Sequence, residues 1–480
     1  MKNLREKFIN GLAWNSINVF VKQGSTVLIH MMLARLLIPE DFGIIGMISI
    51  FIQLSIRLQG AGLGESLVRK KNVTQEEYNF VFFYGLLVGI VCYSILYFLA
   101  PVIANFYAEP KLTLIIRTIT LSLIIIPLSG INKVQLVKNL DFNKITIIEI
   151  IATVLSGMIA IAMAYNDYGV WSLVIQNISL YIISVTLFVI FSRKLPTLSL
   201  NKNKSIGLFS FGSKLMVAGF LQTIFDNIYN VIIGKQYTAS DLGFYTQGMK
   251  LQGIPSNSIS GIIKNVSFPA FANIRDDKKK YKNAFRKTMR LLTFINFPLL
   301  ISLAVVADPL IPLLLSEKWI ESIPFFQMLI IVGLLEPIKS LFVNILKVEG
   351  KADLLIKYIV FTKIFYILGI LISIKINIYA IVISQVLAVL LELIVFSNIR
   401  KEIDYGFMDF LRDISPNLIN ALCVGGTLLL FNQFNLFNDM ITLLIDLVIG
   451  IFVFCFISNI TNNLSFLEIK QEICFRIKQQ

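Results

Sequence analysis

The chain is a succession of long apolar segments separated by short polar ones. Most apolar segments run for about 18 residues or more, enough for a helix to cross the hydrocarbon core of a bilayer. The expected spans are 11–34, 43–63, 80–106, 112–134, 145–165, 169–192, 207–234, 242–264, 287–312, 322–345, 354–374, 376–398, 415–432 and 438–459. The pattern therefore predicts an all-α polytopic membrane protein with about 14 transmembrane helices.

The distribution of lysine and arginine predicts the orientation of these spans. With the N-terminus inside, thirty of the 43 basic residues fall in loops on the cytoplasmic side or at the helix ends next to them, and five fall in loops on the other side. Cytoplasmic loops of membrane proteins collect basic residues, so both termini are expected in the cytoplasm. The same rule accounts for the formal net charge of +14, and no nucleic-acid partner is expected.

A weak internal repeat divides the chain. PEDFGIIG at 39–46 has a counterpart, ASDLGFYT, at 239–246, and each begins the second helix of its half. Pro127 and Pro337 are both expected to interrupt the fourth helix of their half. An even number of helices separates the copies, so the halves share one orientation, as in transporters with parallel repeats. We expect two parallel six-helix bundles, at 1–200 and 201–400, around a central cavity. Two further helices and a cytoplasmic tail follow at 401–480.

Polar residues gather in the first two spans of each half. They recur at three- or four-residue spacing, which places them on one face of each helix. Charges inside a bilayer usually face a cavity or a partner, so these faces predict a net cationic cleft. The predicted substrate-binding residues are Lys22, Arg57, Lys250, Lys214 and Lys264, and the candidates for proton coupling are His30 and Asp226.

Several of these charges also suit a purely structural role. Lys214 and Lys264 lie near cytoplasmic helix ends, where they can reach the headgroups, and so does Arg117 near an outer end. His30 also suits a hydrogen-bonded packing role. Two further cations are expected to be paired: Lys339 follows Glu336 by three residues, and Lys363 has Glu392 or Glu149 as a partner.

The chemistry of the cleft favours an anionic substrate. Arginine binds phosphate through a planar fork and lysine through a mobile point charge, whereas a cleft for cationic drugs would be lined by carboxylates. Asp226 is the only carboxylate in these four spans. An enzyme is not expected, because the longest loop, around 270–286, offers only Asp276 and Asp277 among lysines, and no metal or cofactor site is expected.

Three stretches resemble a known family. LARLLIPEDFG (33–43), GLGESLVRKK (62–71) and VSFPAFANIRDD (266–277) are similar to segments of the polysaccharide repeat-unit flippases of O-antigen and capsule type. These flippases belong to the multidrug/oligosaccharidyl-lipid/polysaccharide exporter superfamily, whose fourteen helices fit the whole chain. The motifs mark loops and helix ends, so the site residues above remain an inference from position.

The resemblance implies a function. Members flip an undecaprenyl-diphosphate-linked oligosaccharide across the bacterial cytoplasmic (inner) membrane by alternating access, for the biosynthesis of O-antigen, capsule or exopolysaccharide. The implied partners are that lipid-linked oligosaccharide and the bilayer, with a polysaccharide polymerase and a chain-length regulator. Two alternatives remain within the superfamily, a multidrug/cation antiporter and a lipid II flippase.

Overall fold

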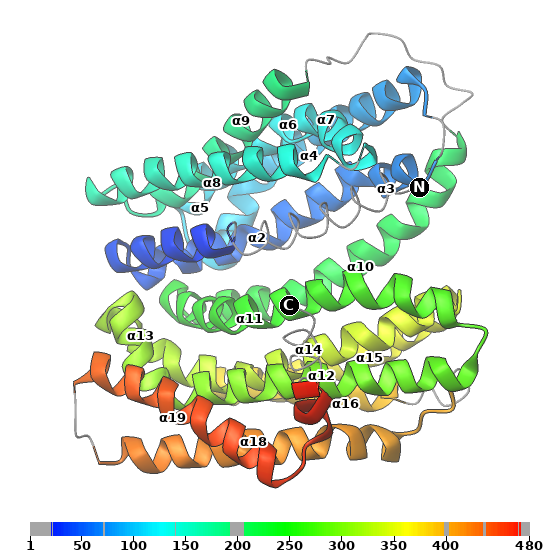
Figure 1. Ribbon diagram of the computed structural model, residues 1–480. Helices are drawn as coiled ribbons and strands as arrows, with labels where there is room; N and C mark the ends of the chain where they lie inside the picture. Colours follow the sequence, from blue (N-terminus) through cyan, green and yellow to red (C-terminus); the bar gives the residue numbers. More distant parts are fainter. Residues whose placement is uncertain are drawn as a thin grey trace. The chain divides into compact units, whose positions relative to one another are not determined.

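The computed structural model describes residues 23–70, 73–139, 141–192, 206–397, 403–434 and 438–468, together with Val21, Lys470 and Gln471. It divides into two compact units, Met1–Thr246 and Gln247–Gln480. Figure 1 shows the helices of each unit along the chain. The boundary expected at residue 200 separates the two copies of the internal repeat, which is a different division from that into compact units. It stays a prediction.

The described residues of unit 1 contain a helix at 23–36, nine complete helices and the first turns of a tenth. These are α2 (Pro39–Gly60), α3 (Leu63–Arg69), α4 (Gln75–Tyr107), α5 (Leu112–Ile119), α6 (Ser122–Ile125), α7 (Pro127–Lys138), α8 (Phe142–Tyr165), α9 (Val170–Ser192), α10 (Ile206–Gln236) and the start of α11 (Ala239–Ile274). The helix at 23–36 packs on α8 and α9, where Leu33 and Leu37 meet Ala160, Ala164 and Leu173.

Unit 2 holds the rest of α11 and the elements that follow it. These are α12 (Lys278–Val305), α13 (Ala307–Leu315), the 3₁₀ helix η2 (Glu317–Ser322), α14 (Ile323–Val348), α15 (Ala352–Ser373), α16 (Ile378–Ser397), α18 (Phe407–Asn432) and α19 (Asp439–Ile460). Within this unit α14 is the most enclosed span, whereas α15 and α19 leave most of their surface outward.

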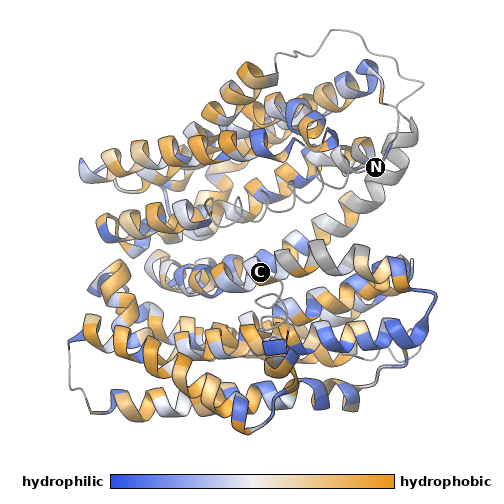
Figure 2. Cartoon of the chain, in the orientation of Figure 1, coloured by the Kyte–Doolittle hydropathy of each residue, from blue (hydrophilic) through white to orange (hydrophobic). Residues whose placement is uncertain are grey.

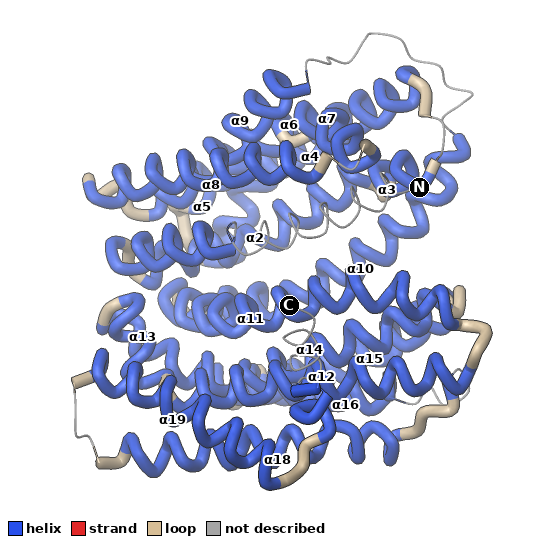
Figure 3. Tube along the Cα trace, viewed as in Figure 1, coloured by secondary structure: helices blue, strands red, loops and turns tan. Residues whose placement is uncertain are grey.

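The described residues confirm the all-α membrane character of the chain. Among the described residues, eleven helices are long and apolar enough to cross a membrane, and none of the elements drawn in Figure 3 is a strand. Figure 2 shows the apolar residues along α8, α9 and α19, and the hydrophilic turn where α12 begins. α10 and α11, with 31 and 36 residues, are not among the eleven. The expected total of fourteen spans stays a prediction.

The repeated D-x-G motif has a capping role in both copies. Asp41 Oδ2 accepts a hydrogen bond of 3.2 Å from the backbone N–H of Ile38 at the start of α2. Asp241 Oδ2 accepts one of 3.0 Å from the backbone N–H of Thr238 at the start of α11. A carboxylate in the first turn satisfies a backbone N–H that the helix leaves without a partner and also suits the helix dipole. The sequence repeat is thus a repeated helix start.

The glycine of each motif permits a close helix crossing within unit 1. A Cβ atom added to Gly43 would lie 1.7 Å from the carbonyl oxygen of Ala239, and one added to Gly243 would lie 2.0 Å from the carbonyl oxygen of Pro39. Each glycine therefore faces the first residue of the other helix. Because the obstructing atoms are backbone atoms, a side chain at either position would push the two helix starts apart.

Pro127 interrupts the fourth helix of the first half, as expected, and a neighbouring side chain repairs the break. A proline at 127 cannot donate to the carbonyl of Leu123 four residues earlier. Gln59 Nε2 on α2 donates to that carbonyl instead, at 2.5 Å. Gly89 on α4 leaves room for this contact, since a Cβ there would lie 2.5 Å from the Leu123 oxygen. Inside a bilayer each freed carbonyl needs such a donor.

The expectation for Pro337 is wrong, because α14 continues through it from Ile323 to Val348. The proline nevertheless frees the carbonyl of Gly333. Asn296 Nδ2 of α12 donates to the carbonyls of Gly333, at 3.3 Å, and Leu334, at 3.1 Å. An amide side chain from a neighbouring helix thus supports the proline in both halves, and in the second half it keeps the helix continuous.

Arg117 has the same kind of role at a third proline. Pro101 lies inside α4 and frees the carbonyl of Tyr97, to which Arg117 Nε donates at 3.3 Å. The guanidinium also lies 4.3 Å from the centroid of the Tyr97 ring, within cation–π range. The expectation that Arg117 simply reaches the headgroups is therefore replaced by a contact inside unit 1.

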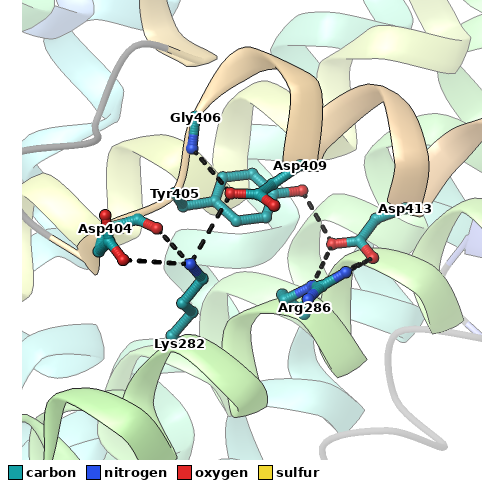
Figure 4. Close-up of polar contacts among 7 residues, drawn as sticks. All are labelled: Lys282, Arg286, Asp404, Tyr405, Gly406, Asp409 and Asp413. Atoms are coloured by element: carbon teal, nitrogen blue, oxygen red, sulfur yellow. Dashed lines mark hydrogen bonds and ion pairs between the residues drawn. The ribbon is translucent and has the colours of Figure 1, made fainter.

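Within unit 2, the start of α18 is held to the start of α12 by a group of ion pairs and hydrogen bonds (Figure 4). Arg286 forms a two-pronged ion pair with Asp413 of α18, with Nε–Oδ2 and Nη2–Oδ1 distances of 2.8 Å. The Tyr405 hydroxyl donates to the same carboxylate at 3.1 Å. One turn earlier, Lys282 Nζ lies 3.4 Å from Asp404 and 3.7 Å from Asp409. A buried, bidentate pair of this kind fixes the orientation of its helices.

Candidate substrate-binding surface

A polar seam joins α2 and α10 within unit 1. Asn227 and Gln53 exchange amide hydrogen bonds of 3.2 and 3.3 Å, and Ser49 Oγ donates to Asn227 Oδ1 at 3.3 Å. Asn230 Nδ2 donates to Ser49 Oγ at 3.4 Å. We call Ser49, Gln53, Arg57, Asn227 and Asn230 the α2–α10 seam. Amide and hydroxyl groups along a membrane helix pair satisfy one another and offer further donors to a polar ligand.

The register of the seam follows from helical spacing. Ser49, Gln53 and Arg57 are four residues apart and lie on one face of α2. On α10, Gly219 and Asn227 are eight residues apart and likewise share a face. As the chain advances along α2 its contacts move back along α10, so the two helices run antiparallel. This register places Arg57 at the end of the seam beside Gly219.

Arg57 lies against α10 and remains exposed. A Cβ added to Gly219 would lie 3.7 Å from Arg57 Cδ and 4.0 Å from its Nε and Nη1 atoms. The glycine thus gives the arginine stem a smooth backbone surface to lie on while the side chain stays accessible. A guanidinium held at its stem presents a fork of donors to a phosphate with little loss of side-chain freedom on binding.

Asp226 is the exposed carboxylate on the same side of α10. It lies seven residues, or about 10 Å along the axis, from Gly219, and so on nearly the same face. Its Oδ1 atom accepts a hydrogen bond of 2.6 Å from Gln222 Nε2. The predicted stripe of polar residues on α10 is therefore present from Gln222 to Asn230, with both a cation and a carboxylate beside it.

In unit 2, one face of α11 packs against α14, and the predicted residue Lys250 lies on the other face. Gly248, Gln252 and Ser256 face α14, since a Cβ on Gly248 would meet Phe326 and one on Gly333 would lie within 2.6 Å of the Gln252 and Ser256 side chains. Lys250 lies two residues from both Gly248 and Gln252, and therefore on the opposite face of the helix. Lys250 is exposed, and so is Asn257 two turns further along that face.

The side chains of three predicted cations are not described by the structure. Lys22 falls outside the described residues. Lys214 lies on α10 and Lys264 on α11, but the positions of their side chains are not described. Their predicted place in the cleft stays a prediction.

His30 is enclosed in the packing of unit 1. Only 6% of its surface is exposed, and its ring meets that of Phe42 edge-on, with 5.4 Å between the centroids. Phe42 belongs to the first turn of α2. This environment favours the packing role that the sequence left open for the histidine.

The sequence interpretation missed Asn227, which holds the seam together. Its signal was available, since Thr223 and Asn227 repeat the four-residue spacing of the polar residues on α2. Asn227 is 5% exposed and is the partner of both Ser49 and Gln53. Among the residues that the structure describes, no three His, Cys, Asp or Glu side chains are grouped for a metal ion.

Comparison with known proteins assigns the chain to a family. A family model described as polysaccharide biosynthesis protein matches residues 32–324, more than half of the chain. The chain is 28% identical over 377 residues to the lipopolysaccharide biosynthesis protein WzxC of Escherichia coli, covering 77% of this chain and 76% of that protein. It is 28% identical over 309 residues to the teichuronic acid biosynthesis protein TuaB of Bacillus subtilis, covering 64% and 63%. It is 26% identical over 327 residues to the succinoglycan biosynthesis transport protein ExoT of Rhizobium meliloti, covering 67% and 65%.

Solved structures confirm the fold. The lipid II flippase MurJ in an inward closed conformation matches with a TM-score of 0.73 and 14% identity, covering 93% of this chain and 98% of that one. An inward-facing multidrug resistance transporter of the MATE family matches with a TM-score of 0.63 and 13% identity, covering 83% and 98%. The chain has the fold of these transporters, and it belongs to the polysaccharide biosynthesis protein family.

Proposed function

We propose that this protein flips an undecaprenyl-diphosphate-linked oligosaccharide repeat unit across the cytoplasmic membrane by alternating access. It is a transporter and not an enzyme. Its relative ExoT is named a transport protein, and its structural neighbours are a flippase and a multidrug resistance transporter. By their names the relatives serve three different polymers: lipopolysaccharide, teichuronic acid and succinoglycan. What such pathways share is the need to move a hydrophilic oligosaccharide head through a hydrocarbon layer, which is costly without a polar path.

The observation that carries the proposal is the exposed Arg57 at the end of the α2–α10 seam. A diphosphate head carries charge that must remain compensated while it leaves water. The Arg57 fork can bind two phosphate oxygens at once, and the amides of Gln53 and Asn230 can bind sugar hydroxyls along the same face. Lys22 and Lys214, which belong to unit 1, would supply further point charges around the diphosphate, and Lys250 and Lys264 of unit 2 stay predicted substrate-binding residues.

A multidrug/cation antiporter is the first alternative, because the fold is shared with both transporter types. Its substrate would need a carboxylate on the exposed seam. Asp226 is an exposed carboxylate on α10, about 10 Å along the axis from Gly219, but its Oδ1 atom already accepts a hydrogen bond from Gln222. A lipid II flippase is the second alternative and would use the same phosphate chemistry. The polymers named for the curated relatives favour a repeat-unit substrate over both.

The proposal extends to the setting of the protein. We place it in the bacterial inner membrane with both termini in the cytoplasm, where the basic loops lie. A polysaccharide polymerase and a chain-length regulator would act on the flipped repeat unit. Asp226 is the better of the two predicted groups for proton coupling, because it is exposed whereas His30 is packed against Phe42.

The proposed function is tested in cells whose surface polymer depends on this protein. Deleting its gene should abolish the surface polymer and leave lipid-linked repeat units that a membrane-impermeant glycosidase cannot reach in spheroplasts. Restoring the gene should make them accessible and restore the polymer. Absence of lipid-linked repeat units from both leaflets would instead indicate a biosynthetic enzyme. Unchanged polymer with a new sensitivity to cationic drugs would favour the antiporter.

A further inference from the structure

Two lysines within the spans of unit 2 are paired with carboxylates, as expected. Lys339 Nζ lies 2.8 Å from Glu336 on α14, and Lys363 Nζ of α15 lies 3.8 Å from Glu392 of α16, so both predicted pairs are confirmed. Lys339 also reaches Glu392, at 3.6 Å. Each of these charges is therefore compensated by a partner of opposite sign.

Asp446, near the start of α19, is enclosed without such a partner. Its side chain is 3% exposed, and neither of its carboxyl oxygens accepts a hydrogen bond. Among the described residues, no lysine or arginine is paired with it. Asp413 of α18 is also 3% exposed, but Arg286 and Tyr405 both donate to its carboxylate. Burial of the two acids is thus alike, and their compensation is opposite.

The place of Asp446 follows from the packing of α19 on α18. Asp446, Gly450 and Ser458 are separated by multiples of four residues and share one slowly winding face. A Cβ on Gly450 would lie 3.8 Å from Leu428, and Asn420 Nδ2 donates to Ser458 Oγ at 3.5 Å. Asp446 and Ser458 are the two buried residues of α19, a helix whose other side chains face mainly outward. Both polar side chains are therefore placed at the contact between the two helices.

Asn432, the last residue of α18, is the polar neighbour of Asp446. The antiparallel register that joins Asn420 to Ser458 brings these two residues to the same end of the hairpin. Asn432 Oδ1 is likewise a buried acceptor without a hydrogen bond. The two side chains thus leave three acceptor oxygens without a donor. A proton on the carboxyl group supplies an O–H donor, which can donate to Asn432 Oδ1.

The cations of the helices beside α19 lie far from Asp446. The charged residues of α18 are in its first two turns, and the last of them, Asp413, is about 28 Å from the end of the helix. α12 touches α19 where the rings of Phe294 and Phe454 lie 4.7 Å apart. Its last cation, Arg290, approaches Glu468, which follows the end of α19. These cations therefore do not compensate a charge near the start of α19.

The charges nearer to the start of α19 are acidic. α13, which also packs on α19, carries Asp308, and α19 itself carries Asp439 seven residues before Asp446. Neither can compensate a negative charge. An enclosed carboxylate without a cation is strongly unfavourable among apolar helices, and the neutral, protonated form avoids this cost.

We propose that Asp446 is a proton-binding site that controls the packing of the start of α19 on the end of α18. With its proton, the carboxyl group donates to Asn432 and this end of the hairpin is closed. When the proton passes to water, the uncompensated carboxylate draws the first turns of α19 away from α18, and the contact of Ser458 with Asn420 holds the other end. Water is close, because Asn432 is only partly buried and Gln433 beside it is exposed. A two-state element of this kind converts proton binding into a change of packing.

The site differs from the proton-coupling groups expected from the sequence, His30 and Asp226, which belong to unit 1. It also lies in the part of the chain, 401–480, that is expected to stand outside the internal repeat. That the proton bound here couples to flipping rests on the proposed function. Proton binding and the packing change do not, because they require no lipid-linked substrate.

Infrared difference spectroscopy of the purified protein in lipid nanodiscs tests the proton itself. Between about pH 5 and about pH 9, where most surface carboxylates are already ionised, the wild type should lose the C=O band of a protonated carboxyl group. The same difference spectrum of Asp446→Asn should lack this band. Identical difference spectra for the two proteins would show that Asp446 exchanges no proton in this range, and would overturn the proposal.

Hydrogen–deuterium exchange at the same two pH values, with rates corrected for intrinsic exchange, tests the packing change. In the wild type, the backbone amides of residues 443–449 should exchange several-fold faster at the higher pH. Asp446→Asn should exchange slowly at both pH values, because its amide is neutral and can donate to Asn432 as the protonated acid does.

Asp439→Asn serves as the matched control, since it removes an exposed acid from the same helix and should keep the wild-type response to pH. A wild type with equal corrected rates at both pH values overturns the proposal. So does an Asp446→Asn variant that keeps the wild-type response or exchanges fast at both pH values. None of these readouts uses the α2–α10 seam or a substrate, so failure here leaves the proposed function standing, and failure of the seam variants leaves this site standing.

Discussion

Replacing Arg57 with alanine should abolish most polysaccharide export while the protein stays in the membrane. The substitution removes the exposed guanidinium at the end of the α2–α10 seam and leaves the hydrogen bonds among Ser49, Gln53 and Asn227 intact. A hydrogen bond to a charged group contributes about 1.5–3 kcal/mol, which corresponds to roughly a tenfold to hundredfold loss of substrate binding. Surface polymer per cell, normalised to the amount of protein in the membrane, measures the effect.

One further variant separates the two-pronged geometry of the guanidinium from its charge, and a second serves as a control. Arg57→Lys keeps the positive charge without the two-pronged geometry and should retain part of the export. Lys111→Ala removes a cation that forms an exposed pair with Glu40 at 3.1 Å, and surface pairs of this kind contribute little. Export should therefore be close to normal in Lys111→Ala. Full export by Arg57→Ala at normal protein levels would show that Arg57 does not bind the substrate.

Replacing Gly43 with alanine should destabilise the protein, although alanine is the better helix former by about 1 kcal/mol. The new Cβ would lie 1.7 Å from the carbonyl oxygen of Ala239, and a backbone atom cannot turn away as a side chain can. Overpacking of this kind costs about 1–3 kcal/mol or more, so the strain should outweigh the gain in propensity. Thermal unfolding of the purified protein in detergent should begin at a lower temperature, and Gly243→Ala should behave in the same way.

Gly60 provides the matched control for this prediction. It lies at the end of the same helix, and a Cβ there would meet nothing within 4 Å. Gly60→Ala should therefore leave the unfolding temperature unchanged or raise it slightly. Equal stability of Gly43→Ala and the wild type would mean that the starts of α2 and α11 do not approach as closely as the structure shows.

The spans and the family could be predicted from the sequence because both depend on local patterns. Apolar runs mark the helices, and the D-x-G copies mark two helix starts. A charge within an apolar run is costly unless it is paired, so it predicts a partner of opposite charge. For this reason Lys363 could be assigned to one of two carboxylates in advance. Arg57 was found in this way too, although the structure places it in the last turn of α2.

The amide contacts could not be predicted, because they depend on residues far apart in the chain. Gln59 meets the carbonyl of Leu123, 64 residues away, and Asn296 meets that of Gly333, 37 residues away. A proline announces that a carbonyl is freed but does not identify the donor. The same holds for Asn227, whose partners lie more than 170 residues away. For Pro337 the sequence predicted a break in the helix that does not occur. Asn296 of α12 donates to the freed carbonyl, and α14 stays continuous.

The most direct measurement of the central claim uses purified protein in liposomes that carry a fluorescent undecaprenyl-diphosphate-linked oligosaccharide in both leaflets. A membrane-impermeant quencher bleaches only the outer leaflet, so flipping makes the remaining probe accessible with time. Vesicles with the wild-type protein should lose nearly all fluorescence, those with Arg57→Ala should do so at least about tenfold more slowly, and protein-free vesicles should keep the inner-leaflet signal. A wild-type protein that flips no faster than protein-free vesicles, or no faster than Arg57→Ala, would contradict the account.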